Sequence, residues 1–251
     1  MTPAELLGLF ERIADGIRDA LLPMTGSARR ERTAKPGQYA IDLVADAVAL
    51  RHLRGTGLAV LSEESGRTGP ADAPITIVLD PVDGSSNAAR DLPYWATSIC
   101  AVDSSGPLAA MVVNQATAVA CTAIRDAGAW REGRRLVSSN VSRVDEAFVA
   151  FSGLPAEILP WKQCRVLGSA ALALTDVASG SLDAFIDAGS WHAPWDYLGG
   201  AMLCREAGAT VRDASRRRID MVDGSVRRQL FAAGTPALVD AMTPSVLVAT
   251  A

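Results

Sequence analysis

The stretch Ile77-Val78-Leu79-Asp80-Pro81-Val82-Asp83-Gly84-Ser85-Ser86-Asn87 determines how this chain is interpreted. Its first residues are apolar and rich in β-branched side chains, which predicts a buried strand. Two carboxylates follow, and small residues then open a segment that has the pattern of a helix. Because proline cannot donate a ladder hydrogen bond, we expect the chain to turn at Pro81. That turn would place Asp80, the Val82 carbonyl and Asp83 on one tight bend.

This bend has the composition of a cation site beside an anion site. Two carboxylates so close would repel each other unless a cation lay between them, and oxygen ligands of this kind favour Mg²⁺ over Zn²⁺. Gly84 and Ser85 offer backbone N–H groups at a helix start, where anions bind readily. The pattern therefore indicates metal-assisted phosphoryl chemistry. The alternative is a plain turn, because Asp, Pro, Gly and Ser all favour turns.

Other segments bear on that choice. Asp223-Gly224-Ser225 repeats the same letters without a preceding strand or second acid, and we expect it to be a turn only. Glu63-Glu64 follows the apolar run 58–61, and Asp196 lies in the first turn of a helix that ends before Gly208. Taken alone, the paired acid indicates a solvated loop, and Asp196 indicates a residue that complements the helix dipole.

In combination, the motifs E-E-S, D-P-V-D-G-S-S-N and W-D-x-x-G-G resemble the inositol monophosphatase family of Mg²⁺-dependent, lithium-sensitive phosphatases. The resemblance extends from about residue 35 to 235. Strands in a meander followed by strands alternating with helices already predict a layered α/β architecture. The resemblance implies an αβαβα sandwich of alternating helix and sheet layers, with the metal site in the cleft between two halves. It also implies a homodimer.

The resemblance implies two Mg²⁺ ions and assigns ligands to each. One ion would be bound by Glu63, Asp80 and the Val82 carbonyl. The second would be bound by Asp80, Asp83 and Asp196, so that Asp80 bridges the two ions. The attacking nucleophile would be water, and no phosphoenzyme is expected.

The same resemblance implies residues that bind the substrate or act on the water. The implied substrate contacts are Asp83, Gly84, Ser85, Ser169, Ala170 and Asp187. Glu63, Ser85 and Asp46 would orient or deprotonate the water, with Asp46 as an alternative ligand of a third ion. The sequence departs from the family pattern at three of these positions. Ser85 replaces the usual threonine, the segment before Asp46 is about two residues shorter, and the spacing from Asp187 to Asp196 is longer.

Composition and the histidines limit the possible functions. The 251 residues carry 24 basic and 28 acidic side chains, so the net charge of −4 provides no basic field for nucleic acid. His192 lies near two acids in the sequence, but no G-x-S-x-G motif is present, which disfavours a serine hydrolase. We expect His192 to lie at the rim of the active cleft and His52 to be exposed.

Within the family, the substrate stays open. A small polyol or sugar phosphate is expected, first of all inositol 1-phosphate, which makes the chain a phosphoric monoester hydrolase. Histidinol phosphate and fructose 1,6-bisphosphate are the alternatives on the same scaffold. The alternative from another class is a non-catalytic relative that acts as a binding partner, although unpaired buried carboxylates would be costly to keep without a cation.

Cysteines and helix signals complete the expectations. Cys100, Cys121, Cys164 and Cys204 lie in apolar surroundings without a C-x-x-C pair, which indicates buried free thiols and a cytoplasmic location. Residues 2–5 have the pattern of a capping box rather than a secretory signal, and no segment is apolar enough to span a bilayer.

The pattern of the chain also predicts its elements. Helices are expected near 3–22, 39–54, 169–179, 195–207 and from 235, with a short one from 85. Strands are expected near 58–61, 75–80, 147–151, 182–186, 209–213 and 229–233, with a meander across 95–137. We expect an N-terminal subdomain, 1–138, with the main metal motifs, and a C-terminal subdomain, 139–251, that supplies Asp196 and the substrate contacts.

Overall fold

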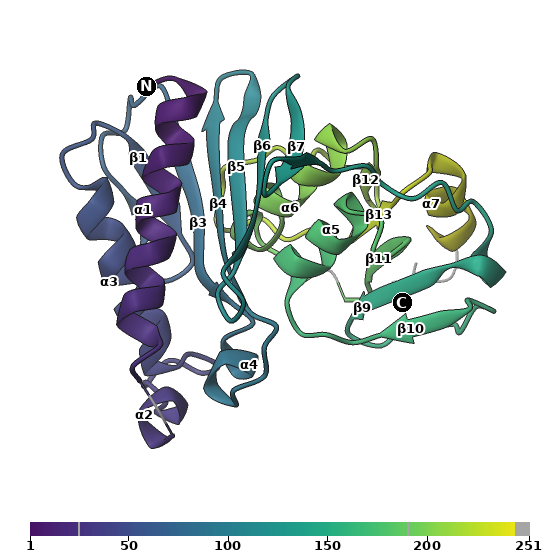
Figure 1. Cartoon of the computed structure of the whole chain (residues 1–251), viewed down its shortest axis with the longest axis horizontal. Helices are drawn as coiled ribbons and strands as arrows, with labels where there is room; N and C mark the ends of the chain where they lie inside the picture. The colour runs from purple at the N-terminus through teal and green to yellow at the C-terminus, as the bar shows by residue number, and fades with distance from the viewer. Residues whose placement is uncertain (25, 190, 244–251) are drawn as a thin grey trace.

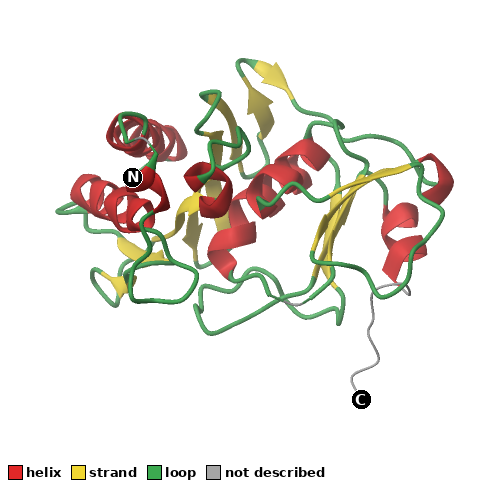
Figure 2. Ribbon diagram, turned by 90° about the horizontal axis from the view of Figure 1, so that it is seen from below, coloured by secondary structure: helices red, strands yellow, loops and turns green. Residues whose placement is uncertain are grey.

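Helices and strands alternate in five layers in the computed structural model, which describes residues 1–24, 26–189 and 191–243 (Figure 1). α1 (Pro3–Leu21) and α3 (Ala40–Leu53) cover the outer face of the first sheet. α5 (Ala170–Ala178) and α6 (Pro194–Glu206) lie between the two sheets, and α7 (Pro236–Met242) packs on the second sheet. Figure 2 shows the same alternation from below. The predicted αβαβα architecture is confirmed.

The first sheet has eight strands in the order β2-β1-β3-β4-β5-β6-β7-β8. Its strands are β1 (Ala59–Ser62), β2 (Gly66–Thr68), β3 (Thr76–Asp83), β4 (Ala96–Asp103), β5 (Gly106–Asn114), β6 (Val119–Ile124), β7 (Gly128–Arg131) and β8 (Arg134–Arg135). β1 and β3 run parallel, and the remaining neighbours are antiparallel. The predicted strands and the meander are confirmed, whereas the short edge strand β2 was not predicted.

The second sheet has five strands in the order β10-β9-β11-β13-β12. They are β9 (Phe148–Ser152), β10 (Gln163–Arg165), β11 (Ala184–Asp187), β12 (Thr210–Asp213) and β13 (Leu230–Ala233). All except the exposed edge strand β10 match predicted strands. Two short helices, α2 (Ser27–Arg30) and α4 (Ser85–Ala89), and a 3-10 turn at Val144–Glu146 complete the described elements.

The layers follow from the alternation of side chains along each strand. In β11, Phe185 faces α5 and α6, whereas Ala184 and Ile186 face α7. One hydrophobic cluster therefore includes residues of both sheets and of the two helices between them. α1 begins at the predicted capping box, in which the Thr2 hydroxyl accepts from the Glu5 N–H and the Glu5 carboxylate accepts from the Thr2 N–H.

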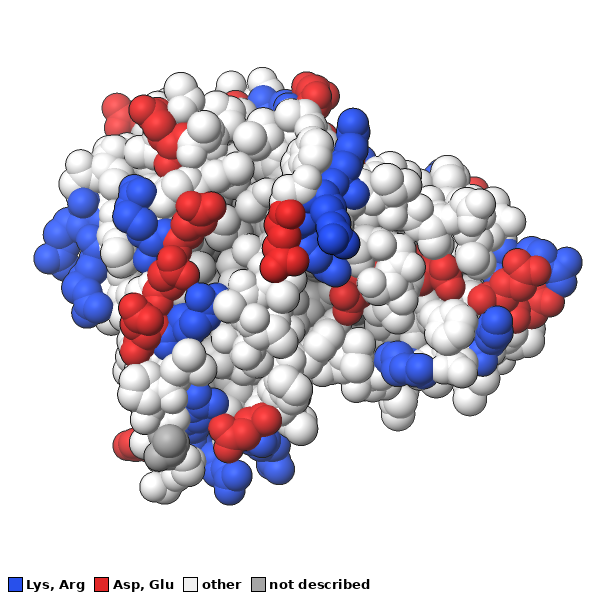
Figure 3. All heavy atoms as spheres, in the orientation of Figure 1, with Lys and Arg blue, Asp and Glu red and all other residues white. Residues whose placement is uncertain are grey.

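The surface agrees with the balanced charge. Basic and acidic side chains are interspersed on the face that Figure 3 shows. No helix within the described ranges is long and apolar enough to cross a membrane. The prediction of four buried thiols is wrong for one of them: Cys164 is exposed because it lies on the edge strand β10, and the other three cysteines are buried.

Candidate metal centre

Three carboxylates from separate elements meet at one end of the first sheet. Glu63 follows β1, Asp80 lies in β3, and Asp196 lies in the first turn of α6. Each offers an oxygen, and these oxygens all lie within 4.8 Å of one another. β1 and β3 are parallel neighbours, and the Glu63 N–H donates to the Leu79 carbonyl at 3.1 Å. That register places Glu63 beside Asp80.

The bend after Asp80 differs from the predicted turn. β3 continues through Pro81 to Asp83, which pairs with Ala96, and the register shifts between Asp80 and Asp83. This break in register accommodates the proline, because a residue at such a break does not have to donate a ladder hydrogen bond. The Val82 N–H donates to Asp80 Oδ1 at 2.9 Å, which fixes the orientation of that carboxylate.

Asp83 lies against the start of α5 and is not one of the three clustered acids. Its Oδ2 accepts from the Ser169 hydroxyl at 2.5 Å and from the Ala171 N–H at 2.7 Å. Ser169 also caps α5, because its Oγ accepts from the Leu172 N–H. The side chains of Asp83 and Ser169, predicted at one site, are thus in direct contact, and Ala170 is the first residue of the same helix.

Burial and mutual repulsion make these acids costly to ionise together. Burial, and then Asp196 and Glu64, raise the pKa of Glu63 to about 8. Burial, and then Glu63, Asp83 and Asp196, raise the pKa of Asp80 well above its ordinary value. Burial raises the pKa of Asp196 to about 7 in spite of nearby His192. Carboxylates that are this costly to ionise together are suited to a divalent cation, so the residues present fit the metal implied by the sequence.

The predicted phosphate cradle lies at the start of α4. Gly84 is the N-cap residue, with a φ of 86°, and no side chain caps this helix. A Cβ at Gly84 would lie 2.9 Å from the Gly168 carbonyl oxygen and 3.3 Å from Ser169 Cβ. Only glycine therefore fits here, because both the left-handed conformation and the close approach exclude a side chain. Ser85 follows as the first helical residue.

The remaining predicted residues lie near this centre but have partners of their own. Asp46, in α3, is buried, and its Oδ1 accepts from the hydroxyls of Ser62 at 2.5 Å and Ser65 at 3.2 Å. Asp187 ends β11 with no exposed surface, and its carboxylate accepts from backbone N–H groups of the following loop. The prediction of a rim position for His192 understates its burial, since only 9% of the residue is exposed.

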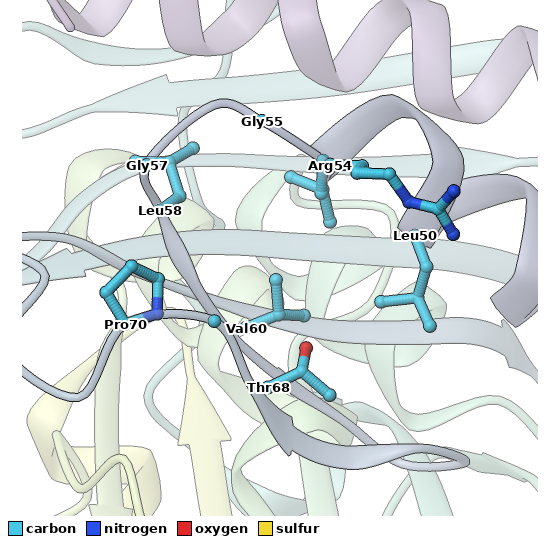
Figure 4. A pocket seen from close by; sticks show the side chains of 10 residues that line it. Leu50, Arg54, Gly55, Gly57, Leu58, Val60, Thr68 and Pro70 are labelled. Atoms are coloured by element: carbon cyan, nitrogen blue, oxygen red, sulfur yellow. The ribbon is translucent and has the colours of Figure 1, made fainter.

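A cavity of about 210 Å³ opens beside the acidic cluster. Asp83, Ser169, His192 and Asp196 contribute its polar side chains together with Ser152. A larger, mostly apolar cavity of about 580 Å³ lies between the end of α3, β1 and β2 (Figure 4). No acid of the cluster lines that second cavity, so the smaller one is the candidate substrate site.

Sequence reasoning missed the serines that hold Asp46 and the contact between Asp187 and His192. The S-E-E-S spacing around Glu63-Glu64 was available as a signal for the first, because serines that flank an acidic pair can reach a neighbouring carboxylate. No local signal existed for the second. The Asp223-Gly224-Ser225 prediction is confirmed, since the Ser225 N–H and hydroxyl both donate to Asp223 in a turn.

Solved structures share this fold over almost the whole chain. A hypothetical protein from Pyrococcus horikoshii, described as similar to inositol-1 monophosphatase, superposes with a TM-score of 0.88 at 23% identity, covering 98% of this chain and 99% of that one. Such a likeness shows that the two proteins share the αβαβα fold.

Sequence comparison identifies the family. A fructose-1,6-bisphosphatase/inositol-1-monophosphatase of Methanothermobacter thermautotrophicus is 32% identical over 90% of this chain and 91% of its own length. Nus factor SuhB of Escherichia coli is 32% identical over 80% of this chain and 79% of its own length. The inositol monophosphatase family matches residues 40–241. The chain belongs to the inositol monophosphatase family.

Proposed function

We propose that this chain is a Mg²⁺-dependent phosphomonoesterase that hydrolyses a small polyol or sugar phosphate. The observation that carries the proposal is the cluster of Glu63, Asp80 and Asp196, which three elements of a family fold bring together, with Asp80 buried and the other two partly exposed. The name of the Methanothermobacter relative, which mentions both a bisphosphatase and a monophosphatase, supports phosphate ester hydrolysis.

The proposed ligands follow the family pattern. Glu63, Asp80 and the Val82 carbonyl would hold one Mg²⁺, and Asp80, Asp83 and Asp196 would hold a second. When bound, the ions supply neutralisation of phosphate charge and activation of the attacking water. The hydrogen bonds from Ser169 and Ala171 fix the direction of the Asp83 carboxylate. A third ion at Asp46 stays an alternative.

Other residues of the chain would bind the substrate and orient the water. The N–H groups of Gly84 and Ser85 would hold phosphate oxygens, since the start of α4 has no side-chain cap. Glu63 and the Ser85 hydroxyl would orient or deprotonate the water. Asp46 would assist through its contacts with Ser62 and Ser65, which immediately flank the Glu63-Glu64 pair.

Inositol 1-phosphate is the first proposed substrate, with fructose 1,6-bisphosphate and histidinol phosphate as alternatives. A non-catalytic binding role is the second candidate function, because the Escherichia coli relative is named a Nus factor and its name mentions no substrate. We also expect inhibition by Li⁺, a homodimer and a cytoplasmic location.

Phosphate release from inositol, sugar, histidinol and nucleotide phosphates, in Mg²⁺ and in EDTA, tests the proposal. Asp80→Asn should abolish release, and Asp145→Asn, at an exposed acid that pairs with Arg143, is the matched control. Metal-dependent release that is lost in the first variant alone supports the phosphatase. Bound Mg²⁺ without release from any ester would favour the binding role.

A further inference from the structure

Three arginines surround another cavity, of about 410 Å³, beside α2 and the end of α4. Its lining residues are Arg30, Arg32, Tyr39, Ala89 and Arg90, which we call the arginine pocket. Tyr39 and Ala89 are buried, with 4% and 1% exposed, whereas the three arginines are exposed. The arginine pocket shares no residue with the candidate substrate cavity or with the three clustered acids. It is therefore a separate feature of the surface.

One side of the arginine pocket is fixed by backbone pairing. Arg32 and Tyr39 form an antiparallel bridge, and the Ala40 N–H donates to the Glu31 carbonyl at 2.9 Å. Arg32 Nη2 donates to the Tyr39 hydroxyl at 2.7 Å, and the guanidinium carbon lies 3.8 Å from the centre of the tyrosine ring. A guanidinium group has five N–H donors, so most of those on Arg32 stay available to a ligand.

The other two arginines lie on either side of Ala89. Arg30 Nε donates to the Ala89 carbonyl at 3.2 Å, which anchors the side chain and leaves its two terminal nitrogens open. Arg90 is the C-cap residue of α4, and its side chain has no hydrogen-bonding or charged partner among the residues that the structure describes. Arg29 differs, because it donates to backbone carbonyls and pairs with Asp91 at 3.0 Å.

The charge of the arginine pocket is not balanced from within. No acid lines it, although the chain as a whole has a net charge of −4. Figure 3 shows basic side chains over α2 and α4 together with acidic ones, and the nearby Asp91 already pairs with Arg29. Guanidinium groups donate in pairs to the oxygens of phosphate, so several of them around one cavity suit a phosphate dianion.

We propose that the arginine pocket binds a phosphate dianion, either free phosphate or a second phosphate of the ester. Its position connects it with the proposed phosphate cradle, because α4 runs from Gly84 at the cradle to Arg90 and its five residues span about 8 Å. The Tyr39 hydroxyl also lies 3.5 Å from Ser86 Oγ, one residue beyond Ser85. Only the connection with an ester rests on the proposed function.

Calorimetric titration of the metal-free protein with inorganic phosphate tests the site. The acidic cluster repels phosphate when no metal is bound, so binding reports the arginine pocket. The wild-type chain should bind phosphate saturably, and added chloride should weaken the binding. Arg90→Ala removes a guanidinium group that supports no other described residue and should raise Kd about tenfold, the value of one charge-assisted contact.

Two further variants separate recognition from general charge. Arg90→Lys keeps the charge without the paired donors and should raise Kd less than Arg90→Ala. Arg51→Ala is the matched control, because this exposed arginine lies in the last turn of α3, far from Tyr39 at the other end, and should bind as the wild type. Thermal unfolding checks that each variant is folded. Equal Kd values in the wild-type chain and Arg90→Ala, or no saturable binding, would overturn the inference.

Kinetics with two esters then distinguish the sources of the phosphate. Fructose 1-phosphate and fructose 1,6-bisphosphate differ only in the second phosphate. A rise in KM in Arg90→Ala that is confined to the bisphosphate supports the ester as the source. An unchanged ratio of the two KM values, with phosphate binding lost, supports free phosphate. If neither the wild-type chain nor any variant hydrolyses an ester, the proposed function fails, and the titration still decides the arginine pocket.

Discussion

The buried carboxylates should make the metal-free protein less stable as the pH rises, and Glu63→Gln should remove much of that loss. The pKa of Glu63 is raised by burial, Asp196 and Glu64 from 4.5 to about 8. Between these values the folded chain binds more protons than the unfolded chain, so the free energy of unfolding falls with increasing pH. The difference between the two pKa values corresponds to about 5 kcal/mol once the pH exceeds 8.

Urea unfolding in EDTA at pH 6 and pH 9 measures this effect. The wild-type chain should lose several kcal/mol between the two conditions, and Glu63→Gln should lose markedly less, because a neutral amide has no charge to bury. Glu11→Gln, at an exposed position of α1, is the control for the same chemical change and should behave as the wild type. Saturating Mg²⁺ should restore stability most at pH 9, where fewer protons compete for the oxygens. Equal losses in the wild-type chain and Glu63→Gln would refute this account of the cluster.

Four further expectations concern activity and backbone geometry. Asp83→Asn should remove most of the turnover while leaving the fold intact, and unchanged turnover at saturating Mg²⁺ would exclude a ligand role. Submillimolar to millimolar Li⁺ should inhibit phosphate release, and a flat inhibition curve would indicate a divergent metal site. Gly84→Ala should destabilise the chain by about 1–3 kcal/mol in thermal or urea unfolding, because its Cβ would meet the Gly168 carbonyl at a φ of 86°. Gly8→Ala in α1 should instead stabilise the chain by about 0.5–1 kcal/mol, because the nearest atom to its added Cβ, apart from the helix backbone and the adjacent residues, is Arg12 Nη1 at 3.7 Å.

Much of the fold could be predicted because its signals are local. The period of apolar residues in α1, the Thr2–Glu5 capping box and the glycine after α6 each depend on neighbours in the sequence. The edge strands β2 and β10 were missed for the same reason, since their short, exposed sequences carry no apolar alternation. Cys164 was assigned to the interior because residue type alone does not distinguish an edge strand from a central one.

The site was less predictable where partners are distant along the chain. Asp83 and Ser169 are 86 residues apart, and nothing near either residue indicates that one carboxylate oxygen is held at the start of α5. The continuation of β3 through Pro81 depends on its pairing with Ala96, which a local reading of proline as a stop cannot anticipate. Likewise, the loop that occupies Asp187 is defined by backbone geometry, and a sequence motif shows only that an acid is present.

The hydrophobic cluster shared by both sheets has a consequence for how the chain folds. α5 and α6 bury one side against Cys100 and Val112 of the first sheet and another against Phe185 and Ala232 of the second. A fragment ending near residue 138 would lack both helices and leave an entire sheet face open to water, so it should aggregate rather than fold. The chain thus passes from one sheet to the other near residue 138, but this point does not divide it into independently folding units. The two halves should unfold together in one transition.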